Sequence, residues 1–151
     1  MAAARVPSRG IAGGQGAAAI EVDADGRPLS VYTTHLAANA TQAEREAQAK
    51  AVLDRVADDD RPSVLVGDFN ADPTDDVVTT LTDQFVDAWD DRPGDHTDRG
   101  FTSNAVLGLT RRIDYVFVGR DRGLRVTAVG VDQQVLSDHL AVVAELARVG
   151  T

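Results

Sequence analysis

The run that most constrains the fold is SVLVG, residues 63–67, which is apolar on both faces of an extended chain. Side chains alternate between the two faces of a strand, so this strand is expected to be buried in the centre of a sheet. A helix is predicted before it, because Thr41 and Glu44 fit a T-x-x-E capping box and Pro62 ends the helical region. Strand, helix and strand in this order indicate a crossover unit.

The strand before this helix is predicted to belong to a hairpin. Residues 17–36 hold two apolar runs around Asp25 and Gly26, and Asp-Gly between apolar runs is a strong hairpin signal. His35 ends the second strand, on the face that is expected to meet the core or a cleft. Further along, the sequence predicts a short helix near 75–81 and strands at 85–89, 111–119, 124–131 and 139–146.

Composition and charge narrow the function classes. The chain has 151 residues, enough for one domain with a core. Its net charge of -9 argues against generic polyanion binding, which depends on Lys and Arg neutralising phosphates. Phosphate chemistry stays open, because a bound divalent cation reverses the local field. With no cysteine, a disulfide framework and a thiolate metal site are both excluded.

The N-terminal stretch is rich in small residues and differs from the rest of the chain. We expect a flexible segment at 1–16, followed by a partial domain at 17–148. The stretch has no long apolar region typical of a secretory signal, and no run approaches the roughly 18 apolar residues of a membrane span. A cytoplasmic location is therefore expected.

Polar side chains recur where predicted strands begin or end. They are His35, Asp68, Asn70, Asp114, Asp138 and His139. Ligands and catalysis in α/β folds gather at such ends. Hydrolysis of a phosphate ester needs a base or orienting group for water, a cation on the phosphate oxygens, and a donor for the developing charge. Asp, Asn and His side chains meet all three needs.

Structural interpretations of the same residues remain open at this point. GDFN, at 67–70, also fits a plain Asx turn. Asp114 shares its strand face with valines and needs a partner, which a backbone amide would provide equally well. SDH, at 137–139, also fits a cap of the last strand. The acidic runs at 58–60 and 90–91 are interpreted as solvated faces.

Four short motifs follow one another in an order that is typical of a known protein family. THL, GDFN, RIDYVF and SDHLAV follow one another between about Ala17 and Leu146. In this order they resemble the endonuclease/exonuclease/phosphatase superfamily, which comprises DNase I-like metal-dependent phosphoesterases. The resemblance implies an α+β fold that is part of a DNase I-like four-layer α/β sandwich, with mostly antiparallel and mixed sheet and flanking helices.

The resemblance covers roughly the C-terminal half of that domain. Family members carry an earlier strand with an Asn and then a Glu that is the principal metal ligand. Glu21 precedes His35 but falls inside the hairpin strand, so the family's metal-binding Glu has no counterpart here. The N-terminal half of the domain is therefore expected to be missing, which makes the chain a truncated or degenerate member.

The resemblance also implies catalytic roles residue by residue. Asp68 looks like the acid that orients or deprotonates the attacking water. His139 resembles the imidazole that stabilises charge on the scissile phosphate, and Asp114 resembles the acid that fixes its tautomer and orientation. His35 resembles a histidine that contacts the phosphate or helps to protonate the leaving group. Asn70 resembles a residue that positions the phosphate or the metal.

A divalent cation follows from the same resemblance. Asp68, Asn70 and Asp138 are the expected ligands of Mg²⁺ or Mn²⁺, since hard oxygen donors favour these ions. The expected activity is hydrolysis of a phosphomonoester or phosphodiester. The alternative is a non-catalytic fragment or degenerate member that binds a phosphorylated ligand or a protein partner. A soluble α/β domain whose acids merely solvate it is the third possibility.

The substrate class is not resolved by the sequence. A phosphorylated small molecule, a phospholipid headgroup and a nucleic acid remain open, although the acidic balance argues mildly against duplex DNA. The loop before the RIDYVF strand offers few cations, and Arg111 and Arg112 are interpreted as strand-end charges rather than phosphate ligands. A half-sandwich is also expected to expose a sheet face, through which the chain would self-associate.

Overall fold

The structure is a computed structural model that describes residues 9–10, 16–24, 26–94, 97–103, 108 and 110–149. A six-stranded sheet has the order β1-β2-β3-β4-β6-β5, and β7 pairs with β8 in a second sheet. The strands of the large sheet are β1 (Arg9–Gly10), β2 (Gly16–Ala24), β3 (Arg27–His35), β4 (Ser63–Asp68), β5 (Phe85–Asp87) and β6 (Asp114–Gly119). The other elements are β7 (Leu124–Val131), β8 (Val142–Arg148), α1 (Gln42–Ala57), α2 (Asp76–Thr82) and α3 (Ala88–Asp91).

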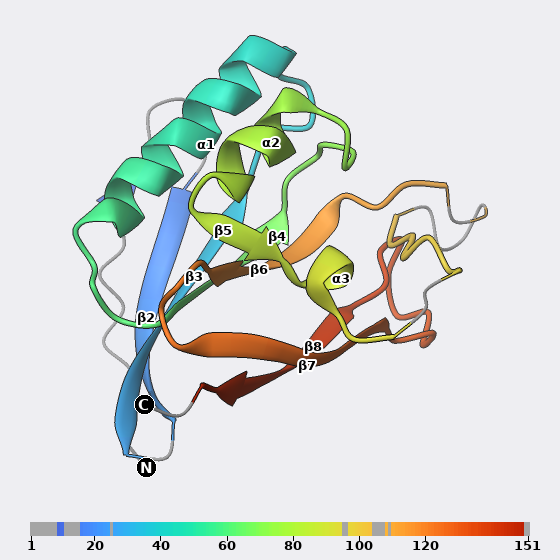
Figure 1. Cartoon of the computed structure of the whole chain (residues 1–151). Coiled ribbons are helices and arrows are strands. Elements are labelled where there is room, and N and C mark those ends of the chain that lie inside the picture. Colours follow the sequence, from blue (N-terminus) through green and yellow to red (C-terminus); the bar gives the residue numbers. More distant parts are fainter. Residues whose placement is uncertain are drawn as a thin grey trace.

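These elements stack in layers (Figure 1). The helices α1 and α2 cover one face of the large sheet, and the β7–β8 sheet lies on the opposite face. The arrangement confirms the predicted α+β sandwich of two sheets with flanking helices. Among the described residues, no helix combines the length and the apolar character that crossing a bilayer requires.

The predicted hairpin is formed by β2 and β3. The two strands pair antiparallel along β2 from Ala17 to Ala24. Gly26 turns the chain with a φ of 75°, a conformation that glycine adopts readily because it has no Cβ. Asp25, the other residue of the predicted turn, lies outside the described residues.

The N-terminal segment 1–16 lies mostly outside the described residues. Its described residues are Arg9, Gly10 and Gly16, and Arg9–Gly10 pairs antiparallel with the start of β2. The flexibility expected for this segment and the domain bounds of 17–148 therefore stay predictions.

The crossover between β3 and β4 is also confirmed. The Thr41 side chain accepts a hydrogen bond from the Glu44 amide, and the Glu44 carboxylate accepts one from the Thr41 amide, which completes the capping box. α1 then returns the chain so that β4 pairs parallel to β3, with His35 opposite Asp68. The apolar face that α1 buries comprises Ala49, Val52, Leu53 and Val56.

Close approach of these two strands depends on a glycine at the end of β4. Gly67 has a φ of 147°, and a Cβ added to it would lie 1.8 Å from the carbonyl oxygen of Thr34 on β3. A side chain there is excluded both by the backbone conformation and by this contact. The strand can therefore carry Asp68 beside His35 only because residue 67 is glycine.

The strand β6 contributes to both layers of the core. Tyr115 and Phe117 point toward the helices, where the ring of Phe69 packs edge-on against them at centroid distances of 5.6 and 5.2 Å. Val116 and Val118 point toward the β7–β8 sheet and pack in a second apolar cluster. The alternation predicted from the sequence is thus confirmed, and it places Asp114 on the face between the two sheets.

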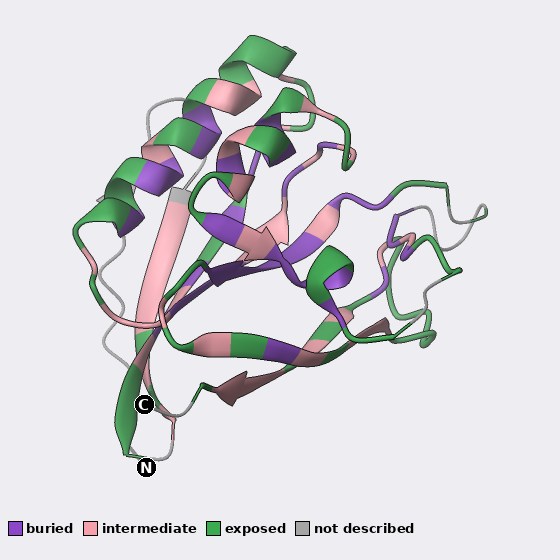
Figure 2. Ribbon diagram, viewed as in Figure 1, coloured by how far each residue is buried: buried purple, intermediate pink, exposed green. Residues whose placement is uncertain are grey.

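The layer between the sheets is only partly buried. Val126 of β7 is buried, but most apolar residues that pack around it keep some exposure: Leu124, Val129, Val142, Ala144 and Leu146. Figure 2 shows β7 and β8 mostly in the colours of intermediate and exposed residues, whereas β6 is mostly buried. The small sheet therefore contributes less apolar burial than the helical layer does.

The interpretation of residues 58–60 as a solvated face is wrong for Asp59. Its carboxylate accepts hydrogen bonds from Ser30 Oγ and the Tyr32 hydroxyl, both at 2.6 Å, and from Arg61 Nε at 2.8 Å. Burial disfavours the charged form, but the bonds from Arg61, Ser30 and Tyr32 outweigh it and hold the pKa of Asp59 below its usual value. Asp59 therefore ties the end of α1 to β3.

We predict that Gly67→Ala destabilises the protein by about 3 kcal/mol or more, because the added Cβ meets the Thr34 carbonyl and the φ angle is unfavourable for alanine. Urea unfolding followed by circular dichroism measures the change. Gly130→Ala is the matched control, since a Cβ at Gly130 meets nothing within 4 Å. Equal midpoints for the two variants would contradict the proposed constraint.

Candidate active site

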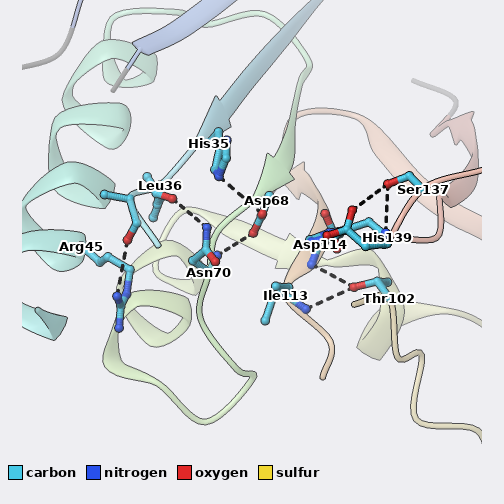
Figure 3. Close-up of polar contacts among 12 residues, drawn as sticks. His35, Leu36, Arg45, Asp68, Asn70, Thr102, Ile113, Asp114, Ser137 and His139 are labelled. Atoms are coloured by element: carbon cyan, nitrogen blue, oxygen red, sulfur yellow. Dashed lines mark hydrogen bonds and ion pairs between the residues drawn. The ribbon is translucent and has the colours of Figure 1, made fainter. Parts of the chain in front are cut away.

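Three neighbouring strands of the large sheet bring three of the predicted residues together, because each residue lies at the end of its strand. His35 lies opposite Asp68 in the parallel β3–β4 pair, and Asp68 lies opposite Asp114 in the antiparallel β4–β6 pair. Residues directly opposite one another in a sheet project from the same face. His35 Nε2 is 3.5 Å from Asp68 Oδ2, and the His35 side chain is 66% exposed (Figure 3). The register alone thus assembles a row of polar groups.

The GDFN segment holds Asp68 and Asn70 around a buried anchor. Phe69 is fully buried between the two polar residues, and its amide donates to the carbonyl of Ile113 at 2.8 Å. The Asn70 amide donates to Asp68 Oδ1 at 2.8 Å, which closes an Asx turn, and Asn70 has a φ of 48°. The turn interpretation is therefore correct as geometry, and the same turn orients Asp68 toward His35.

Asn70 also joins this turn to the end of β3. Its Nδ2 donates to the carbonyl of Leu36 at 2.9 Å, and the Leu36 amide donates to the carbonyl of Asp68 at 2.9 Å. Because the side-chain nitrogen of Asn70 is used in this bond, the side-chain oxygen is the atom able to accept a hydrogen bond or coordinate a cation.

Asp68 is partly buried and lies near a second negative charge, the carboxylate of Asp114. Burial raises the pKa of its carboxyl group, and the nearby Asp114 carboxylate raises it further, while the Asn70 amide and the two histidines act in the opposite direction. A carboxylate in such a place is stabilised in its charged form when a cation binds beside it.

His139 and Asp114 form the closest side-chain pair of the site. His139 Nδ1 lies 2.9 Å from Asp114 Oδ2, and the His139 amide donates to Ser137 Oγ at 3.0 Å. The two side chains are 32% and 20% exposed, so the pair is shielded but reachable. This pairing supplies the partner that an acid on an apolar strand face requires.

The donor set fits a hard divalent cation. Ligand atoms of Asp68, Asp114 and His139 all lie within 4.8 Å of one another. Mg²⁺ commonly binds proteins through one or two carboxylates and completes its shell with water and substrate phosphate. The two carboxylates match that pattern, while the Nδ1 of His139 is already paired with Asp114.

Asp138 lies apart from these donors. It is exposed, and its Oδ1 accepts a hydrogen bond from Ser137 Oγ at 3.1 Å. Within the described ranges, the group of possible ligands contains Asp114 in its place. The expected metal role of Asp138 thus stays a prediction without a matching cluster.

Several residues that hold the site in place lie outside the four motifs and were not predicted from the sequence. Gln48 on α1 accepts a hydrogen bond from the Ala37 amide, and Arg45 donates to the carbonyl of Ala40, so α1 fixes the segment after His35. Thr102, which the sequence gives only as part of a loop, contacts the backbone at Asp114. No periodicity marks such residues, because their roles depend on long-range contacts.

The two arginines before Asp114 both bind acids of the protein itself. Arg111 forms an exposed ion pair with Asp72 at 2.9 Å. Arg112 donates to Asp87 at 2.6 Å, with both side chains almost fully buried, and its guanidinium lies 4.8 Å from the centre of the Tyr115 ring. Both arginines are thus engaged within the structure, as the charge interpretation predicts.

The model of the Endonuclease/Exonuclease/phosphatase family matches residues 5–139. The chain belongs to this family. The resemblance carried by the four motifs is therefore confirmed, while comparison with curated protein sequences finds no match.

Solved structures support the family fold. The mannosyl-6-phosphatase of Bacteroides thetaiotaomicron VPI-5482 superposes with a TM-score of 0.76 and 19% identity, covering 88% of this chain and 57% of that one. The human Nocturnin catalytic domain with bound sulfate gives a TM-score of 0.72 and 22% identity, covering 95% and 57%. A family member from Beutenbergia cavernae DSM 12333 gives 0.64 and 27%, covering 90% and 40%. The chain therefore spans little more than half the length of the first two.

We predict that Arg112→Ala lowers the free energy of unfolding by about 3–5 kcal/mol, because Asp87 is then a buried charge without its partner. Arg111→Ala is the adjacent control and is expected to cost less than about 1 kcal/mol, since its ion pair with Asp72 is exposed. Chemical denaturation measures both. A cost for Arg112→Ala as small as that of Arg111→Ala would show that the buried pair is not needed.

Proposed function

We propose that this family member is a metal-dependent phosphoesterase and that Asp68, Asp114 and His139 form the centre of its active site. The observation that carries the proposal is the His139–Asp114 pair, which lies within 4.8 Å of Asp68 at the edge of the sheet. An imidazole oriented by a carboxylate beside a second carboxylate is suited to proton transfer and to stabilising charge on a phosphate.

Each residue has a distinct part in this proposal. Asp68 orients or deprotonates the attacking water, since it is partly buried and lies beside His35. Asp114 accepts from His139 Nδ1–H, so Nε2 takes up a proton as a base and, in the doubly protonated imidazolium, donates to a phosphate oxygen. His35 is exposed beside Asp68 and contacts the phosphate or the leaving group. Asn70 contributes its amide oxygen to the phosphate or cation side of the site.

Mg²⁺ or Mn²⁺ is the proposed cofactor. Asp68 would hold it, together with Asn70 and, as the resemblance implies, Asp138. When bound, such a cation neutralises charge on the phosphate oxygens and lowers the pKa of a bound water. Asp68 is the one carboxylate of the described cluster that this proposal assigns to the cation, so affinity for the free cation should be modest, and substrate phosphate would increase it.

The charges around the site favour a small phosphorylated substrate over a long nucleic acid. The two arginines just before Asp114 are paired with acids of the chain, Arg111 with Asp72 and Arg112 with Asp87. Binding of a polyanion requires cations that release counterions from several phosphates. The net charge of -9 opposes such binding further. The expected cytoplasmic location stays a prediction.

A non-catalytic member that binds a phosphorylated ligand is the second candidate. It is favoured by one observation, the small number of carboxylates in the described donor cluster. The two candidates differ in turnover, because a binding protein would bind phosphate and cation without releasing product.

We predict that the chain hydrolyses bis-p-nitrophenyl phosphate with Mg²⁺ or Mn²⁺ and loses this activity with EDTA. Asp68→Asn and His139→Asn should each lower kcat/KM by about 10² to 10⁴-fold, since each removes a proton-transfer or charge-stabilising group. Asp72→Asn is the matched control: it lies four residues beyond Asp68, is paired with Arg111, and should retain activity. Metal-independent turnover, or equal rates in all variants, would refute the assignment; phosphate binding without turnover would support the second candidate.

We also propose that an exposed surface of the β7–β8 sheet joins two copies of the chain. A shallow groove of about 400 Å³ runs along it, lined by apolar groups of Ala128, Val129, Val131 and Val143, with Asp132 and Glu145 also lining it. Val143 is 55% exposed. Apolar surface of this kind favours association, while the negative charge of each copy opposes it.

Sedimentation velocity should therefore show more dimer at 0.5 M NaCl than at 0.05 M, because salt screens the repulsion between copies. Val143→Asp should leave a monomer under both conditions. Val149→Asp is the control, since Val149 is similarly exposed but does not line this groove. A monomer at every concentration and salt level would contradict the proposed contact.

A further inference from the structure

The two members of the His139–Asp114 pair come from different parts of the fold. Asp114 is the first residue of β6 in the large sheet, and His139 lies in the segment that leads into β8 of the small sheet. The pair is 2.9 Å apart, so the two sheets must be held in a fixed relation at this point. The layer between the sheets is only partly buried, and packing alone provides a weak restraint there.

A short segment at 102–103 lies between these two backbones and bonds to both. The amides of Thr102 and Ser103 donate to the carbonyl of Arg111, at 2.8 and 3.1 Å. On the other side, the Leu140 amide donates to the carbonyl of Thr102 at 2.7 Å, and Ser103 forms a β-bridge with His139. The segment thus connects the residues just before Asp114 with His139 and the residue after it.

The Thr102 side chain adds a further contact at the centre of this connection. Thr102 is completely buried, and its Oγ1 accepts hydrogen bonds from the backbone amides of Ile113 and Asp114, each at 3.3 Å (Figure 3). One hydroxyl oxygen therefore satisfies a buried backbone donor, at Ile113, and a partly buried one, at Asp114. The direction in which the Asp114 carboxylate leaves the backbone follows from this fixed peptide.

We propose that Thr102 is a positioning residue for the phosphoesterase site: its hydroxyl and its backbone hold Asp114 and His139 in register across the two sheets. The inference rests on the proposed function, and it assigns to Thr102 no contact with substrate. Groups that orient a catalytic pair commonly change activity by about 10- to 100-fold when removed. Small displacements of a catalytic group are costly because the reacting geometry is narrow.

Two substitutions separate the hydroxyl from the packing of its side chain. Thr102→Val keeps the shape and removes the hydroxyl, so the amides of Ile113 and Asp114 lose their acceptor. Thr102→Ser keeps the hydroxyl and removes only the methyl group. Val56→Ala, in the buried face of α1, is the control for a general loss of stability far from the site.

The first readout does not require an active protein. In ¹⁵N-histidine-labelled full-length chain, the His139 Nδ1–H proton should resonate far downfield because it is bonded to a carboxylate, and its assignment follows from its loss in Asp114→Asn. We expect this signal to be retained in wild type, Thr102→Ser and Val56→Ala, and to be lost or shifted in Thr102→Val. The second readout is the metal-supported hydrolysis of bis-p-nitrophenyl phosphate, in which Thr102→Val should lower kcat by about 10- to 100-fold with little change in KM.

The outcomes distinguish the two proposals. Absence of turnover in wild type would count against the phosphoesterase, yet the histidine signal would still test the positioning role. An unchanged signal in folded Thr102→Val, or equal loss of signal in Val56→Ala, would overturn the role of Thr102. If Thr102→Val fails to fold, Thr102→Ser becomes the test. Loss of the His139 signal in Thr102→Ser, at a melting midpoint equal to that of Val56→Ala, would then overturn the role of the Thr102 hydroxyl.

Discussion

The parallel pairing of β3 with β4 is the constraint on which the rest of the structure depends. It sets His35 opposite Asp68, and through the next strand it sets Asp68 opposite Asp114. The pairing needs α1 as its crossover and needs glycine at residue 67, where the backbone of β3 leaves no room for a Cβ. A shift of one residue in this register would turn Asp68 toward the helices and put Gly67 or Phe69 in its place.

The candidate active site also shows how polar groups are distributed around a buried anchor. Phe69 fills the helical core, while its neighbours Asp68 and Asn70 face the site and the end of β3. Burial raises the pKa of Asp68, so the fold holds a carboxylate where its charge is costly unless a cation is near. Asp59 is a second partly buried carboxylate, and its charge is stabilised by hydroxyl and guanidinium donors rather than by a cation.

Much of this fold was predictable from local sequence signals. The capping box at Thr41, the turn at Gly26 and the alternation around Asp114 each follow from near neighbours in sequence, and each is confirmed. The close pairing of Asp114 with His139 was predictable only through the resemblance to a family. Asp59 and Thr102 were not predictable, because their partners lie 29 and 12 residues away and no repeating pattern connects them.

The uneven burial of the two sheets has a consequence for the motions of the site. Asp68 and Asp114 are attached to strands in the middle of the well-packed sheet, whereas His139 is attached to the half-exposed β7–β8 sheet. Free energies of local opening are lowest where few apolar groups are buried. The amide hydrogens of β7 and β8 should therefore exchange with solvent faster than those of β4 and β6. The small sheet should therefore open locally more often than the sheet that carries Asp68 and Asp114, and the bonds of residues 102–103 keep His139 beside Asp114 when it does.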